Sequence, residues 1–142
     1  MERFKSFDVV SSEYLSFDGT KKTGLFLVLK CKDSNLLCAK ITSQFDSRFL
    51  YYSVLMLQRT NPFLQCDSYI QLDKLHTIAD DSCQIIGSLA PIIRTEVKNV
   101  INRFHYDLLE ELNKEIRTKY RSPNKWRPIF VMLWNKISVF KL

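Results

Sequence analysis

The chain has 142 residues, of which 46% are hydrophobic and 25% are charged, and its formal net charge at pH 7 is +6. This length suffices for one hydrophobic core, and the composition excludes a disordered or fibrous protein. No stretch approaches the roughly 20 consecutive apolar residues that cross a bilayer, and no apolar signal segment follows Met1–Lys5, so we expect a cytoplasmic protein without a membrane segment.

Six short segments rich in Val, Ile, Leu and aromatic residues precede any long helical pattern, and such segments favour β-strands. Asp18-Gly19 marks the turn of an opening hairpin, and Asn61-Pro62 ends the fourth segment. Five or six short strands of this kind indicate a barrel or sandwich and not a parallel α/β sheet. In chain order the segments are Phe7–Tyr14, Leu25–Lys30, Leu36–Thr42, Phe49–Leu57, Ser68–Ile78 and Cys83–Ile86.

A long helix is predicted from Pro91 to about Tyr120, because proline is tolerated at the first helical position and apolar residues then recur every three or four positions. Ser122-Pro123-Asn124 ends it. The apolar segment Ile129–Phe140 is too short to span a membrane, so we expect it to pack on the barrel or on a partner.

The positive charge is concentrated at the C-terminal end. Residues 1–111 hold 13 basic and 14 acidic side chains, whereas residues 112–142 hold eight basic side chains and a single acidic one, Glu115. A basic patch is typical of proteins that bind phosphate-rich partners, although a solvated helix face has the same composition. We therefore predict a barrel with the first part of the helix over residues 1–111, and a basic helical and apolar extension over residues 112–142.

The four cysteines are Cys31, Cys38, Cys66 and Cys83, and they form no Cys-x-x-Cys pair with a nearby histidine. We interpret them as free, buried thiols in a reducing compartment. The sequence predicts neither a metal site nor a cofactor.

The order of these segments resembles the PemK/MazF family of toxin endoribonucleases over about residues 5–105. The resemblance implies an α+β, mainly β fold: a small SH3-like barrel of five to six strands, then a long helix and a short C-terminal extension. It also implies a homodimer and a groove that an antitoxin occupies. The pieces that carry the resemblance are Phe7–Val10, Lys21–Val28, Ala39–Ser43, Ser68–Ile78 and Ile85–Leu89.

The family is described as cutting single-stranded RNA without metal, which requires proton transfer and stabilisation of charge on phosphorus. Carried over by position, Asp73 would be the acid or base, Thr42 and Ser43 would supply hydroxyls, and Lys22 would supply a cation. Two arginines expected from the family pattern are missing: Thr23-Gly24 and Gln71 stand in their places. Lys22 lies beside the first of these gaps, but an ammonium lacks the bidentate fork of arginine.

Seven further residues are predicted to contact RNA. An unperturbed pKa near 6.5 suits His76 to acid–base work, yet strand alternation turns it away from Asp73 unless a bulge intervenes, so a rim or dimer-contact histidine is the alternative. Phe45, Phe49, Tyr51 and Tyr52 either stack on bases or pack in a core or interface. The predicted RNA contacts are Lys21, Gln71, Lys74, His76, Arg117, Lys119 and Arg121.

Two functions are compatible with the sequence. The first is a toxin-type protein that acts on single-stranded RNA as a metal-independent endoribonuclease. The second is a non-catalytic barrel whose basic extension binds a protein or nucleic-acid partner in an assembly.

Overall fold

The computed structural model describes residues 3–16, 18–44 and 51–119, and the side chains as far as Glu115. The chain divides into two units, Met1–Val100 and Ile101–Leu142. The predicted boundary at residue 111 stays a prediction, and the apolar segment Ile129–Phe140 lies outside the described residues.

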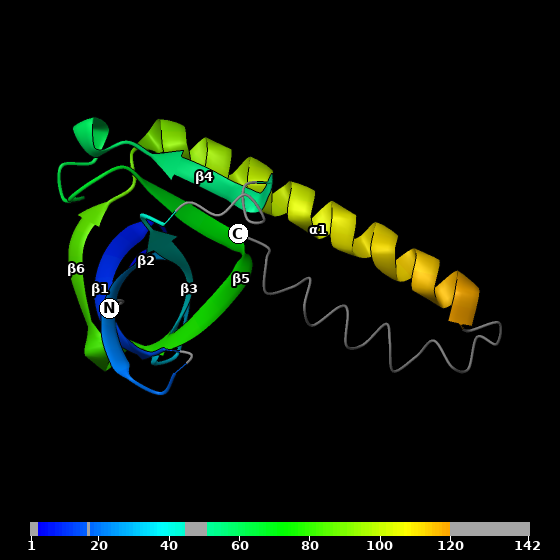
Figure 1. Cartoon of the computed structure of the whole chain (residues 1–142), viewed down its shortest axis with the longest axis horizontal. Coiled ribbons are helices and arrows are strands. Elements are labelled where there is room, and N and C mark those ends of the chain that lie inside the picture. Colours follow the sequence, from blue (N-terminus) through cyan, green and yellow to red (C-terminus); the bar gives the residue numbers. More distant parts are fainter. Residues whose placement is uncertain (1–2, 17, 45–50, 120–142) are drawn as a thin grey trace. The chain divides into compact units, whose positions relative to one another are not determined.

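The first unit is a six-stranded antiparallel sheet that curls into a half-barrel (Figure 1). The strand order is β4-β5-β3-β2-β1-β6. The predicted mainly β fold of five to six strands followed by one long helix is therefore confirmed. The elements are β1 (Asp8–Leu15), β2 (Lys21–Lys32), β3 (Asn35–Thr42), β4 (Ser53–Met56), β5 (Ser68–Ala79), β6 (Cys83–Ser88) and α1 (Pro91–Lys119).

The turn between β1 and β2 is closed by hydrogen bonds from one carboxylate. Asp18 accepts from the hydroxyls of Ser16 and Thr20, each at 2.6 Å, and from the Thr20 amide at 3.1 Å, and these bonds hold the pKa of Asp18 well below its usual range. Gly19 has φ of +84°, a conformation that favours glycine. The predicted Asp-Gly turn is confirmed, and it places Lys22 near the start of β2.

Strand β4 ends one residue before the predicted segment does, because the chain turns at Leu57. The Leu57 carbonyl accepts hydrogen bonds from the backbone amides of Thr60 and Asn61, and from the Asn61 side chain at 2.9 Å. A carbonyl engaged in this short 3-10 turn is no longer available to extend a strand. Of the predicted segment Phe49–Leu57, only Ser53–Met56 forms β4, and residues 49–50 lie outside the described residues.

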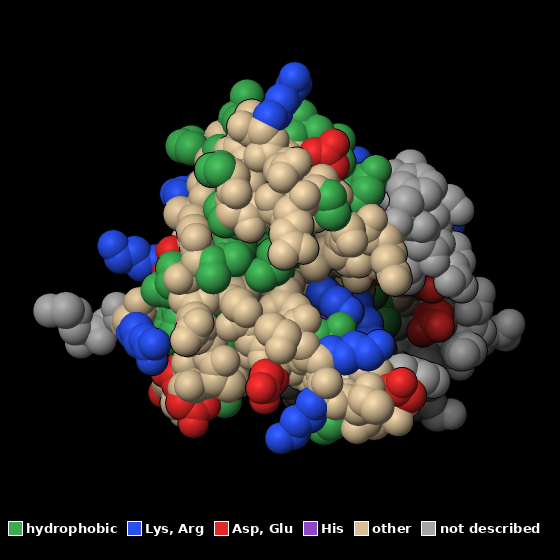
Figure 2. Space-filling view, turned by 60° about the vertical axis from the view of Figure 1, so that its left-hand side comes forward, with side chains coloured by type: hydrophobic (Ala, Val, Ile, Leu, Met, Phe, Trp, Pro, Cys, Tyr) green, Lys and Arg blue, Asp and Glu red, His purple; other side chains and the backbone are tan. Residues whose placement is uncertain are grey.

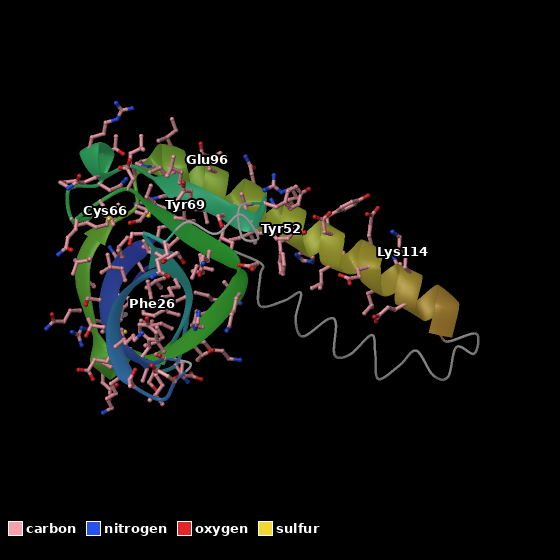
Figure 3. The ribbon with its side chains drawn as sticks, in the orientation of Figure 1. Phe26, Tyr52, Cys66, Tyr69, Glu96 and Lys114 are labelled. Carbon is pink, nitrogen blue, oxygen red and sulfur yellow. The ribbon has the colours of Figure 1, made fainter. Side chains whose placement is uncertain are left out.

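The core lies on both faces of β2, since Phe26–Leu29 are all buried. Phe26 lies inside the curl of the sheet (Figure 3), in a cluster with Val28 and Cys38. The first turns of α1 are tied to this unit by Arg94, whose guanidinium donates to the Leu89 carbonyl at 2.7 Å. Burial of aliphatic and aromatic side chains on both faces therefore stabilises the half-barrel.

Strand β5 contains a bulge opposite β3. Ala39 pairs with Leu75, yet the next residue, Lys40, pairs with Gln71, so residues 72–74 have no counterpart on β3. Cys38 and Lys40 are two residues apart on β3, so their side chains lie on the same face of the sheet. Their partners on β5 are His76 and Gln71, and the bulge therefore brings these two residues to that face as well.

Strand β6 is one edge of the sheet and is poor in buried side chains. Ile85 and Ile86 are exposed there, and Ile92 is exposed on the first turn of α1. A space-filling view shows hydrophobic side chains gathered on the surface of the molecule, with lysine and arginine side chains around them (Figure 2). An exposed apolar edge strand is a surface that another chain can cover.

Candidate functional site

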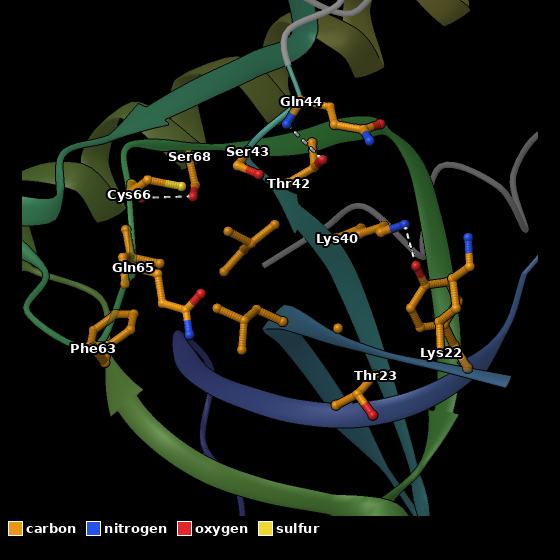
Figure 4. Close-up of a pocket in the computed structure, with 15 residues that line it drawn as sticks. Lys22, Thr23, Lys40, Thr42, Ser43, Gln44, Phe63, Gln65, Cys66 and Ser68 are labelled. Atoms are coloured by element: carbon orange, nitrogen blue, oxygen red, sulfur yellow. Dashed lines mark hydrogen bonds between the residues drawn. The ribbon is translucent and has the colours of Figure 1, made fainter.

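A cleft of about 600 Å³ opens beside β2 and β3 (Figure 4). Its walls come from the end of β1, the start of β2, the end of β3 and the segment that leads into β5. The described residues that line it are Tyr14, Lys22, Thr23, Gly24, Leu25, Lys40, Ile41, Thr42, Ser43, Gln44, Phe63, Leu64, Gln65, Cys66 and Ser68.

Residues 63–67, which lead into β5, are held by a contact with β6 and by local hydrogen bonds. A Cβ on Gly87 would lie 2.5 Å from the Phe63 ring, so this ring packs directly on the backbone of β6. The Asp67 carboxylate accepts the Gln58 amide at 2.8 Å, and the Ser68 hydroxyl donates to the Cys66 carbonyl at 3.0 Å. This wall of the cleft is therefore held by local hydrogen bonds and one aromatic contact.

Two lysines supply the positive charge of the cleft. Lys22 is exposed near the start of β2, whereas Lys40 is half-buried on β3. The Lys40 ammonium donates a hydrogen bond to the Tyr14 hydroxyl at 2.9 Å. Sequence reasoning missed Lys40 as a site residue, although a lysine that shares a strand face with Leu36 and Cys38 is a signal that could have found it.

The predicted hydroxyls also line this cleft. Thr42 is half-buried at the end of β3, and its oxygen accepts the Gln44 amide at 3.2 Å. Ser43 is exposed beside it. A hydroxyl oxygen that accepts a bond keeps its own hydrogen for another acceptor. The structure thus places Thr42, Ser43 and Lys22 in the lining of one cleft.

Asp73 is not among the residues that line the cleft. It lies in the bulge of β5, between the fully buried Leu72 and the exposed Lys74. The described lining contains no carboxylate and no imidazole. The described cleft is therefore a cationic and polar surface, favourable for an anion.

The other predicted RNA contacts lie outside the cleft lining. Lys21 is exposed at the start of β2, and Gln71 faces Lys40 across the strand pair. Arg117 and Lys119 belong to the backbone of α1, but their side chains lie outside the described part, as does all of Arg121.

The aromatic residues after Ser43 are described only in part. The rings of Tyr51 and Tyr52 meet edge to face, with centroids 4.7 Å apart, and Tyr51 is exposed. Phe45 and Phe49 lie outside the described residues.

His76 lines a second cavity, of about 320 Å³, which shares Tyr14 as a wall with the cleft. Its ring meets Phe26 edge to face at 5.7 Å. Burial, and then the positive charges of Lys74 and Lys40, lower the pKa of His76 from its ordinary value near 6.5. The imidazole is therefore neutral at pH 7.

This burial predicts a specific dependence of stability on pH. The unfolded chain binds a proton at His76 more readily than the folded chain does, so the free energy of unfolding should fall as pH drops below about 6.5 and level off below the lowered folded pKa. His76→Gln should remove this part of the slope in urea unfolding measured between pH 7.5 and 5. The matched control is His105→Gln, on α1, and an unchanged slope in His76→Gln would contradict the assignment.

The cysteines are free thiols in the described structure, but their burial differs. Cys38 and Cys83 are buried, and burial raises the pKa of Cys38 to about 12. The prediction of buried thiols is wrong for Cys66, which is exposed because it lies on the segment that forms the cleft wall.

The helix of the described chain, α1, is not apolar enough over its length to cross a membrane.

Among known proteins, the chain is similar to solved structures but not to any family model or curated sequence. No protein-family model and no curated protein sequence matches it. Among solved structures it is similar to the Mycobacterium tuberculosis toxin MazF-mt6, with 18% sequence identity and a TM-score of 0.55, over 68% of this chain and 94% of that chain. At this identity the likeness shows the fold alone: a MazF-like six-stranded half-barrel followed by a helix.

Proposed function

We propose that the chain is a divergent PemK/MazF-like, toxin-type protein that acts on single-stranded RNA as a metal-independent endoribonuclease. The observation that supports this most is the convergence of Lys22, Lys40, Thr42 and Ser43 on one polar cleft of a MazF-like barrel. Ammonium groups and hydroxyls are the donors that bind the phosphates of a nucleic-acid backbone.

A cleft of this kind suits a single strand better than a duplex. Proteins that bind single strands combine a positively charged groove along the backbone with side chains on which unpaired bases stack. Lys22 and Lys40 supply the charge, and Tyr14 supplies a ring in the cleft wall.

The proposed reaction is a transesterification followed by release of the downstream strand. The ribose 2′-oxygen attacks the phosphorus and forms a cyclic phosphate, while the bond from phosphorus to the 5′-oxygen breaks. One group takes the proton of the 2′-hydroxyl, and another gives a proton to the leaving 5′-oxygen. Asp73 is our candidate for one of these transfers.

We expect this cleavage to be slow. Lysines stand near the positions at which the family pattern has arginines, and Asp73 lies in the β5 bulge outside the cleft lining. Loss of one preorganised donor commonly lowers the rate by about 10²–10³. These residues therefore support binding of RNA together with slow cleavage.

The test is incubation of the purified chain with a long single-stranded RNA in a chelating buffer. We expect slow cleavage that leaves 2′,3′-cyclic phosphate ends, and we expect Lys22→Ala and Asp73→Ala each to lower the rate by about 10²-fold. Lys30→Ala is the matched control, because Lys30 is exposed on β2 and does not line the cleft. RNA that stays intact at high protein concentration would rule out the enzymatic function.

A second candidate function is favoured by the lack of a carboxylate or an imidazole in the described cleft lining. On this proposal the barrel of residues 1–111 is a non-catalytic scaffold, and the basic extension of residues 112–142 binds a protein or nucleic-acid partner.

The remaining proposals follow the family resemblance. We propose that the protein works in the cytoplasm, forms a homodimer and pairs with an antitoxin. The exposed edge strand β6, with Ile85 and Ile86, supports an interface with another chain.

A further inference from the structure

We infer that Tyr14 and Lys40 form a hydrogen-bonded pair that binds an RNA phosphate in the cleft, and that Gly24 makes room for this pair. The inference rests on the proposed function and deepens it, because it names the group of the substrate that the pair recognises. None of the three residues was predicted from the sequence as part of the site.

The Lys40 ammonium is half-buried, and the described part of the chain offers it no counter-ion. Its hydrogen-bond partner is the Tyr14 hydroxyl, at 2.9 Å, and no described carboxylate forms an ion pair with it. A partly desolvated charge is unfavourable unless it is paired. An anion that enters the cleft would pair with this charge.

The Tyr14 hydroxyl supplies a second donor for the same anion. Its oxygen accepts a hydrogen bond from the Lys40 ammonium, so its own hydrogen is available to a further acceptor. Tyr14 also pairs with Lys22 across β1 and β2, and directly opposed residues of antiparallel strands have neighbouring side chains. One phenol and two ammonium groups therefore line the same cleft (Figure 4).

The ring of Tyr14 is held in place by the sheet. It meets the fully buried Phe26 edge to face, with centroids 5.7 Å apart and planes at 83°. A Cβ on Gly24 would lie 2.9 Å from a ring carbon of Tyr14, closer than real Cβ contacts allow. Gly24 therefore leaves the space that the ring occupies.

Lys40 also places a positive charge beside Gln71, a neutral residue of β5. Lys40 lies directly opposite Gln71 on the pair of strands β3 and β5. The cation is thus supplied from β3, next to the neutral residue of β5.

The experiment measures binding of a fluorescein-labelled, single-stranded RNA that carries 2′-O-methyl groups throughout. Such an RNA cannot form the cyclic phosphate, so affinity is measured apart from cleavage. Titrations at several salt concentrations report both the affinity and the number of phosphates neutralised, because the slope of log K against log salt changes by about 0.7 for each contact with a single strand.

We expect Tyr14→Phe to weaken binding about tenfold without changing the salt slope, because it removes a neutral donor and keeps the ring. Lys40→Met should weaken binding by a similar factor and reduce the slope by about 0.7. The double variant should lose less than the product of the two effects, since the residues act as a unit. Lys30→Met, at an exposed position of β2 outside the cleft, is the matched control for lost charge.

Gly24→Ala is a second way to disturb the pair. It keeps the phenol and the ammonium but displaces the Tyr14 ring, so binding should weaken about as much as in Tyr14→Phe. Circular dichroism verifies that each variant is folded. If Tyr14→Phe and Lys40→Met lower stability but bind RNA as well as Lys30→Met does, the pair is only structural and the inference is wrong. If the unaltered chain binds no RNA, the proposed function fails as well, and this outcome is distinct from the first.

Discussion

Replacement of Phe26 by alanine is expected to lower the free energy of unfolding by about 3–5 kcal/mol. Phe26 is fully buried in the cluster inside the curl of the sheet, and its ring supports Tyr14 and His76 by edge-to-face contacts at 5.7 Å. The cost combines lost transfer of the ring from water with the cavity that remains. Urea unfolding of the full chain measures it.

The same substitution should also weaken RNA binding, because the Tyr14 ring loses a neighbour that fixes it. Phe26→Leu is the matched control, since it keeps an apolar side chain and should cost much less than the alanine variant. An unfolding midpoint of Phe26→Ala equal to that of the unaltered chain would contradict the role of this residue in the core.

Removal of residues 122–142 is expected to weaken RNA binding by about 10- to 100-fold at moderate salt. This stretch carries four basic side chains and no acidic one. Each phosphate contact that is lost should reduce the salt slope by about 0.7. The barrel should stay folded, because the buried cluster around Phe26 comes from residues 4–83.

A charge variant of the full-length chain separates the effect of charge from the effect of length. In this variant the four basic residues of the stretch 122–142 are replaced by glutamine. If the extension binds phosphates, the variant should show most of the loss of RNA affinity that the truncated chain shows. Binding with an unchanged salt dependence in both forms would exclude the extension as the nucleic-acid-binding element. The substituted residues are Lys125, Arg127, Lys136 and Lys141.

The fold was largely predictable because its signals are local. Alternation in Ser68–Ile78, the turn at Asp18-Gly19 and the helical start at Pro91 each depend on neighbours in the chain, and the structure has a strand, a turn and a helix there. The end of β4 was not predictable in this way. It depends on the Leu57 carbonyl, which accepts four hydrogen bonds from Thr60 and Asn61 in a turn, so that the strand ends at Met56.

The candidate site was predictable only in part. Thr42 and Lys22 follow from the order of the motifs, and the structure places both in one cleft. The pairing of Tyr14 with Lys40 depends on strand register and on the space at Gly24, and no local pattern encodes either.

The position of Asp73 depends on the bulge. Strand alternation alone treats β5 as continuous, whereas residues 72–74 have no partner on β3. The periodicity of the sequence does not reveal where two strands leave register, so the place of this carboxylate could be found only from the structure.

Tyr14 is a shared wall of the cleft and of the cavity beside His76. The same ring packs edge to face on Phe26, which also lines the cavity beside His76. The two spaces are therefore linked through one side chain, and a substitution that reshapes the smaller cavity is expected to shift the phenol that faces the cleft.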